Sequence, residues 1–303
     1  MATKIHHHIV YILLRSVLSA GSKLPLTTLR RFGRLLAPAA FKLSQRRRRR
    51  ISQNLEMAMP ELDGGQRRRL AKQVAQHFGK NLAEVIWMQR ATAGDLTALV
   101  EIEGLHHLEK ARESGSGAIL ATAHCGNWEF LGTRLSVAGI PTFYAVRDLY
   151  DERVDNIITG LRSKFGTEVI HRGKGTTRKI FGALAHNKVN GLLIDQDIKD
   201  LRGTFVPFFG RLAWTPTGAA QLSLKLRAPM VPAFIHRRDD GSHLIEIHPQ
   251  LEPRDDLDKV DSINDLTARA TSAIEEQVRR HPAQWVWMHR RWRTRPEDDH
   301  TPI

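Results

Sequence analysis

Hydrophobic positions divide the chain into a helical first part and a second part in which short apolar runs alternate with helical periodicities. Up to about residue 95 the apolar residues recur at helical spacing. Asp63, with Gln66 three positions later, forms a capping-box pattern and predicts a long helix that ends near Met88. Later strands are predicted at residues 100–103, 117–123, 142–146, 168–170, 189–195, 230–236 and 244–248. Later helices are predicted at residues 105–113, 127–138, 152–164, 176–186, 215–226 and 263–280.

This alternation from Val100 onward predicts an α/β fold, in which helices flank a largely parallel central sheet. For the helix after residue 214, Thr215 is the expected N-cap and Pro216 the expected first helical residue. We predict two parts. Residues 1–50 form a helical segment that associates with membranes, and residues 51–303 form the catalytic domain, with a helical lead-in to about residue 95.

The first apolar run, residues 9–20, is too short to span a bilayer as a helix, which takes about 20 apolar residues. On a helical projection its apolar side chains lie on one side, and Arg15, Ser16 and Ser19 lie on the other. That pattern is typical of a helix in the membrane interface. It equally fits a surface helix packed on the protein's own core.

The pattern of residues 23–50 favours the interpretation that this part of the chain binds a membrane. Leucine and phenylalanine alternate there with lysine and arginine, and the segment ends in five consecutive arginines, Arg46 to Arg50. Apolar residues beside a polybasic cluster match a segment attracted to anionic headgroups. A nucleic-acid-binding arm is the alternative, but such arms seldom carry so many Leu and Phe residues.

Composition narrows the partners and cofactors. The 46 Lys and Arg exceed the 32 Asp and Glu by 14, so we expect an anionic partner: nucleic acid, a membrane surface, or an acidic or phosphorylated substrate. The single cysteine excludes an intramolecular disulfide and a Cys-rich metal site. His6 to His8 lack a carboxylate or Cys complement, so we predict no metal and no cofactor.

The chemistry is expected at His124, which follows the buried strand predicted over residues 117–123. Ligands of α/β sheets lie beyond the carboxyl ends of strands. Glu129 is five residues on, about 140° away on a single helix, so the pair converges only if the chain turns at Gly126. A carboxylate beside an imidazole fixes its tautomer and stabilises the protonated ring. The alternative is a structural histidine followed by an ordinary first-turn glutamate.

The segment His124-Cys125-Gly126-Asn127-Trp128-Glu129 resembles the H-x-x-x-x-D/E motif of the glycerolipid acyltransferase superfamily. More narrowly, the chain is similar to the late acyltransferases of lipid A biosynthesis and their mycobacterial phosphatidylinositol mannoside acyltransferase relatives. Further blocks of this family follow in its order: GLLIDQD at 191–197, VPFFG at 206–210, TPT at 215–217, APMVP at 228–232 and WVWMHRRW at 285–292. The similarity therefore covers nearly the whole chain.

This resemblance implies that His124 is the general base for an acceptor hydroxyl, which attacks the thioester of a fatty acyl donor. The donor would be acyl carrier protein or coenzyme A. Asp195 and Asp197 compete with Glu129 as the carboxylate that orients His124. The implied acceptor is a phosphorylated glycolipid, a lipid A precursor, at the cytoplasmic face of a Gram-negative inner membrane. A lysophospholipid or another envelope glycolipid is the alternative acceptor, and a nucleic-acid-binding protein is a less favoured alternative that no recognised motif supports.

Three residues are candidates for substrate binding. Arg162, by its offset from the motif, best matches an arginine implicated in relatives, and Arg147 is a second candidate for holding a phosphate. Either could instead be a solvated surface arginine. Asn127, inside the motif, is the third candidate. We interpret Cys125 as a packing residue, and the Trp- and Arg-rich tail, residues 285–293, as suited to a membrane interface.

Overall fold

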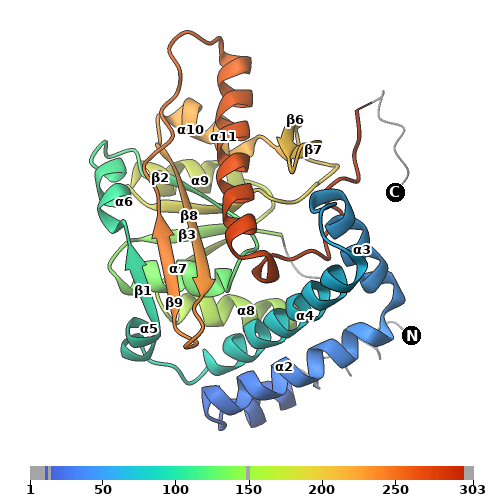
Figure 1. Cartoon of the computed structure of the whole chain (residues 1–303). Coiled ribbons are helices and arrows are strands. Elements are labelled where there is room, and N and C mark those ends of the chain that lie inside the picture. Colours follow the sequence, from blue (N-terminus) through green and yellow to red (C-terminus); the bar gives the residue numbers. More distant parts are fainter. Residues whose placement is uncertain (1–10, 13–14, 148–150, 297–303) are drawn as a thin grey trace.

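A seven-stranded sheet, in the order β1-β9-β8-β2-β5-β3-β4, forms the centre of the computed structural model, which describes residues 11–12, 15–147 and 151–296 (Figure 1). All neighbouring strands are parallel except β8 and β9. The predicted α/β class and largely parallel sheet are confirmed. The strands of this sheet are β1 (Val100–Glu103), β2 (Ala118–Thr122), β3 (Thr142–Val146), β4 (Glu168–His171), β5 (Val189–Leu193), β8 (Met230–Arg237) and β9 (His243–Ile247).

Helices cover both faces of the sheet, as Figure 1 shows. Successive side chains of a strand point to opposite faces, and β2 follows this rule with hydrophobic residues on both. Ile119 and Ala121 belong to one buried cluster, and Ala118 and Leu120 to the other. The helices after β1 are α6 (Leu105–Arg112), α7 (Trp128–Val137), α8 (Glu152–Ser163), α9 (Thr176–Ala185), α10 (Gly218–Leu226), α11 (Lys259–Arg280) and the 3-10 turn η1 (Pro282–Gln284).

One predicted helix start is wrong. Thr215 and Pro216 end a strand, β7 (Arg211–Pro216), which pairs with β6 (Gly203–Phe208) in an antiparallel hairpin that the sequence pattern did not indicate. The Thr215 hydroxyl accepts a hydrogen bond from Arg291 instead of capping a helix. Helix α10 begins two residues later than expected, at Gly218, after Thr217. Tertiary pairing of the hairpin thus overrides the local capping signal.

Helices precede the sheet as predicted: α2 (Leu26–Leu43), α3 (Gln45–Ala58), α4 (Gly64–Trp87) and α5 (Ala93–Leu99). The capping box of Asp63 and Gln66 is confirmed at the start of α4. Helices α2 and α4 approach closely where Gly33 faces Gly79, since a Cβ on Gly33 would lie 2.2 Å from the Gly79 carbonyl oxygen.

The amino-terminal segment bears on the membrane hypothesis. Part of the expected interfacial helix, Ile9, Val10, Leu13 and Leu14, lies outside the described residues, while residues 15–21 are helical. In the part of the chain that the structure describes, no helix has the length and apolarity to cross a membrane. Helix α3 runs through residue 50, and a domain division there stays a prediction.

Candidate active site

His124 lies beside Asp195 because the strands that precede them are parallel neighbours. Thr122 of β2 is in register with Leu193 of β5, so the residues two positions further along each strand reach the same point of the sheet edge. There Nδ1 of His124 lies 2.8 Å from Oδ1 of Asp195. The two residues are separated by 71 positions in the sequence. Strand pairing therefore produces the imidazole–carboxylate pair.

Asp195 is buried and accepts two further hydrogen bonds, from the backbone N–H of His124 and from the indole N–H of Trp285. Burial alone would raise the pKa of Asp195, but the nearby His124 and these hydrogen bonds outweigh it and hold that pKa well below its usual value. The carboxylate is therefore ionised. It can accept a hydrogen bond from the N–H at Nδ1, which leaves Nε2 as the basic nitrogen.

Two residues from other segments surround Nε2 of His124. The side-chain amide nitrogen of Gln196 lies 3.1 Å from Nε2 of His124 and 2.8 Å from Nε2 of His289. Burial and the neighbouring His124 lower the pKa of His289 to about 4. At neutral pH His289 is therefore uncharged and adds no repulsion when His124 takes up a proton.

The turn after His124 is held by three segments. Gly126 has φ of +55°, and a Cβ there would lie 2.1 Å from the carbonyl oxygen of Ile235, so only glycine fits. Its N–H donates to the carbonyl of Gln284, and its carbonyl accepts hydrogen bonds from Asn81 and His77. The active-site turn is thus fixed between η1 and α4.

A buried ionic cluster supports the same side of the turn. Glu84 of α4 is fully buried and pairs with Arg237, Arg30 and His243. Burial alone would raise the pKa of Glu84, but its cationic and imidazole neighbours outweigh it and hold that pKa well below the usual range. The second oxygen of Glu84 accepts a hydrogen bond from the Asn127 amide. The cluster therefore connects α2, α4, β8 and β9 to the motif.

Glu129 does not pair with His124 in this structure. Its carboxylate is bound bidentately by Arg162, with distances of 2.8 and 2.7 Å. Tyr144 lies beneath this pair, 5.8 Å from the guanidinium carbon to the ring centroid. The structure therefore brings together two predicted site residues, Glu129 and Arg162, and separately His124 and Asp195. The catalytic and substrate-binding roles of all four stay predictions.

The remaining candidates occupy three different environments. Arg147 is exposed after β3, whereas Asn127 is buried and bound to Glu84. Asp197 accepts hydrogen bonds from Thr294, and no contact joins it to His124 among the described residues. Cys125 is buried, and burial with the nearby Asp195 charge raises the pKa of its thiol well above the ordinary value. A thiolate nucleophile is therefore disfavoured at that position.

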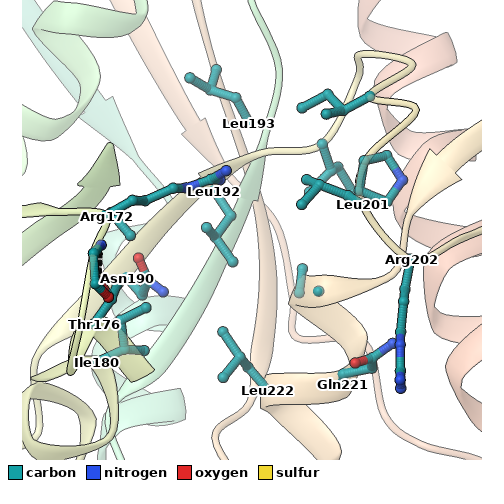
Figure 2. Close-up of a pocket in the computed structure, with 17 residues that line it drawn as sticks. Arg172, Thr176, Ile180, Asn190, Leu192, Leu193, Leu201, Arg202, Gln221 and Leu222 are labelled. Carbon is teal, nitrogen blue, oxygen red and sulfur yellow. Dashed lines mark hydrogen bonds between the residues drawn. The ribbon is translucent and has the colours of Figure 1, made fainter. Parts of the chain in front are cut away.

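An apolar cavity of about 510 Å³ opens beside the end of β5 (Figure 2). Leu192, on β5, projects into it, with Ile180 of α9 and Leu222 of α10 at its lower edge in this view. Leu193 and Ile194, which directly precede Asp195, also line it. Asn190 lines the cavity with both side-chain polar atoms buried and without a hydrogen-bond partner. Arg172 and Arg202 line it as well, so the cavity can hold an extended apolar group beside polar ones at the end of β5.

Three side chains are arranged as the ligands of a metal ion would be. His236, Glu246 and His281 offer ligand atoms that lie within 4.8 Å of one another, in the described part of the chain. Arg280 already binds Glu246, at 2.7 Å. None of the three contacts His124 or Asp195, and the absence of a metal from the reaction stays a prediction.

Comparison with known proteins identifies the family. The sequence profile of the bacterial lipid A biosynthesis acyltransferases matches residues 2–294. The chain belongs to this family. It is 26% identical over 282 residues to the lipid A biosynthesis lauroyltransferase of Escherichia coli K12, covering 91% of this chain and 88% of the relative. The palmitoleoyltransferase of the same organism is 26% identical over 278 residues, 90% of this chain and 88% of the relative.

A relative that is named for a different lipid also matches part of the chain. The phosphatidylinositol mannoside acyltransferase of Mycolicibacterium smegmatis is 27% identical over 207 residues, 66% of this chain and 64% of the relative. The lipid A acyltransferase family thus confirms the resemblance inferred from the motifs. It also establishes the protein as an acyltransferase and disfavours nucleic-acid binding as its main function.

Sequence reasoning left three neighbours of His124 without a role: Gln196, His289 and Trp285. All three lie in blocks that resemble this acyltransferase family, which is the signal that could have indicated them. The same tail shows a wrong expectation. Trp285, Trp287 and Trp292 are at most 5% exposed and pack in the core, so their indoles are not available to a membrane interface.

Proposed function

We propose that the protein transfers a fatty acyl chain from an acyl thioester to a hydroxyl of a lipid A precursor. The observation that carries this proposal is the His124–Asp195 pair at the sheet edge, with an apolar cavity beside it. The family supports the class of donor and acceptor. Acyl carrier protein is the donor we expect, with coenzyme A as the alternative.

In the proposed reaction, Nε2 of His124 accepts the proton of the acceptor hydroxyl as its oxygen attacks the thioester carbonyl carbon. The tetrahedral intermediate collapses with cleavage of the carbon–sulfur bond. The departing thiolate then takes the proton from the imidazolium, so an ester and a thiol are formed. Asp195 stabilises the imidazolium between these steps.

Direct assay of the purified protein tests this function. Acyl carrier protein and coenzyme A thioesters would be offered with lipid A precursors, lysophospholipids and phosphatidylinositol mannosides, and products identified by mass spectrometry. We expect a new ester on the lipid A precursor. Transfer only to a lysophospholipid or a mannoside would move the acceptor to another lipid class, and no transfer to any acceptor would reject the function.

The apolar cavity is the proposed site of the acyl chain, because its hydrocarbon lining begins at the residues that precede Asp195. Ile180→Trp should fill part of it and shift the preferred donor to shorter chains, with about a ten-fold loss on the longest chain that wild type accepts. Competition between thioesters of different length measures this shift. Ile180→Val is the matched control, and an unchanged length preference in Ile180→Trp would place the chain elsewhere.

We also propose that α2 and α3 attach the protein to an anionic membrane, at the cytoplasmic face of the inner membrane. Phe32, Leu35, Leu36 and Leu43 fall on one face of α2 at helical spacing and are 52%, 70%, 65% and 90% exposed. The arginine run begins α3 directly afterwards. An exposed apolar stripe beside cations suits the boundary between headgroups and acyl chains.

Vesicle sedimentation separates the apolar contribution from the charged one. Replacing Arg46 to Arg49 by glutamine should weaken binding to anionic vesicles most strongly at low salt, where charges are least screened. Replacing Leu35, Leu36 and Leu43 by glutamine should weaken binding at every salt concentration. Unchanged binding in both variants would show that the attachment surface lies in another part of the chain.

A further inference from the structure

A small pocket between α3 and the carboxyl-terminal segment is lined by three arginines. Its volume is about 210 Å³, and its lining includes Arg50 from α3 together with Arg290 and Arg293 from the carboxyl-terminal segment. Figure 1 shows α3 beside the segment that follows α11, and Asn54 joins them by hydrogen bonds to the carbonyls of Trp287 and His289. The pocket is therefore held by defined contacts between distant parts of the chain.

The three arginines of the pocket have few carboxylate partners. Within residues 11–12, 15–147 and 151–296, no ion pair involves Arg50 or Arg290. Arg293 has a carboxylate neighbour, Asp197, but their distance of 3.6 Å is longer than that of a hydrogen-bonded ion pair. None of the described residues that line the pocket is acidic. Burial and the neighbouring charges of Arg290 and Arg46 lower the pKa of Arg50. An anion in the pocket would relieve this repulsion.

A second observation points to a ligand. Trp292 lines the same pocket and is only 5% exposed, yet its indole N–H has no hydrogen-bond acceptor. A buried donor without a partner costs about 1–3 kcal/mol. Three guanidinium groups and an unpartnered N–H together match the oxygens of a phosphate group, which accepts charge-assisted hydrogen bonds in several directions.

This pocket adjoins the catalytic histidine. His289, which precedes Arg290, has its ring centroid 5.1 Å from that of His124 and contacts Gln196. Arg162, expected from the sequence to hold a phosphate, is instead bound bidentately by Glu129. Arg50 and Arg290, by contrast, have no ion-pair partner in the part of the chain that the structure describes.

We propose that Arg50, Arg290, Arg293 and the indole N–H of Trp292 form the binding site for a substrate phosphate. This inference rests on the proposed function. Both substrates can carry the group, the acceptor on its sugar and the donor in its phosphopantetheine arm. The acceptor is the expected source, because the pocket lies beside the base that must meet the acceptor hydroxyl.

Kinetics on phosphorylated and dephosphorylated acceptor test the site. The Arg50→Gln/Arg290→Gln double variant should raise KM for the phosphorylated acceptor about ten-fold to a hundred-fold with little change in kcat. On the dephosphorylated acceptor, wild type and variant should have the same KM. Arg254→Gln removes an exposed charge that lies outside the pocket and outside the proposed membrane surface, and should behave as wild type.

A second set of assays compares two acyl donors, namely acyl carrier protein thioesters and a simple acyl thioester that has no phosphate. A KM effect confined to the phosphate-bearing donor would support the site and assign it to the donor. Equal losses on both acceptors and both donors would overturn the inference, because the arginines would then serve the fold.

A readout independent of activity is the binding of inorganic pyrophosphate to the full-length protein by calorimetry. We expect affinity about ten-fold weaker in the double variant than in wild type or Arg254→Gln. Equal affinity in all three proteins would overturn the site. Weakened pyrophosphate binding in a protein that transfers no acyl chain would keep the site and reject the proposed function.

Discussion

Replacing His124 by alanine should lower kcat for acyl transfer by about 10²–10⁴-fold, because general acid–base catalysis contributes rate factors of that size. Asp195→Asn should cause a loss in the same range, since the amide cannot stabilise the imidazolium that forms on proton uptake. Both variants should retain the wild-type circular dichroism spectrum. Rates at saturating donor and acceptor, measured by product mass spectrometry, provide the comparison.

Two controls make this result specific. Cys125→Ser should stay active, because the buried, protonated thiol has no nucleophilic role. Glu129→Gln breaks the pair with Arg162 but leaves the contact between His124 and Asp195. If Asp195→Asn retained activity and Glu129→Gln lost it, Glu129 would be the orienting carboxylate, and the chain would have to rearrange when substrate binds.

Replacing Arg237 by methionine should reduce the free energy of unfolding by about 3–5 kcal/mol, because breaking a buried ionic network leaves its remaining polar groups short of partners. Arg237 is buried and contacts both oxygens of Glu84, as well as Asn81 and His77. Urea denaturation of the purified protein measures the change. Because Asn81 and His77 hold the Gly126 carbonyl, kcat should fall as well.

Arg238→Met is the matched control, one residue along the chain. Arg238 is about one-third exposed and pairs with Glu101 and Glu103 at the surface, where an ion pair contributes about 0–1 kcal/mol. The two variants should therefore differ by several kcal/mol in unfolding free energy. Equal values for both would show that the Glu84 cluster adapts to the loss of one arginine.

Local patterns in the sequence were sufficient for most of the elements. Strand β2 is an almost continuous apolar run because both of its faces are covered, and the cap of α4 was evident from Asp63 and Gln66. Patterns failed where long-range contacts decide the conformation. Thr215 has the side chain of an N-cap, but strand pairing and Arg291 hold it in β7.

In the candidate site too, local patterns indicated single residues, and long-range contacts decided which of them meet. His124 at the end of an apolar strand could be identified from the sequence as a candidate, together with Glu129, Asp195 and Arg162 as candidate charged residues of the site. The sequence could not show which of these charged side chains contact one another, because the order of strands in a sheet is not encoded in the spacing of residues along the chain. Pairing of β2 with β5 places Asp195 at His124 and leaves Glu129 to Arg162.

The carboxyl-terminal segment, residues 285–292, shows that burial also depends on the tertiary structure. Composition alone does not separate an indole at a membrane interface from one in the core, since both environments suit a large apolar ring with one polar atom. Packing of residues 285–292 against the sheet edge buried Trp285, Trp287 and Trp292. The sequence by itself thus determined the fold class, through local periodicity, and indicated His124 as the candidate base, through its place at a strand end and the motif that it begins. The tertiary structure alone decided the partner carboxylate and the arginine pocket, because both depend on segments far apart in the chain.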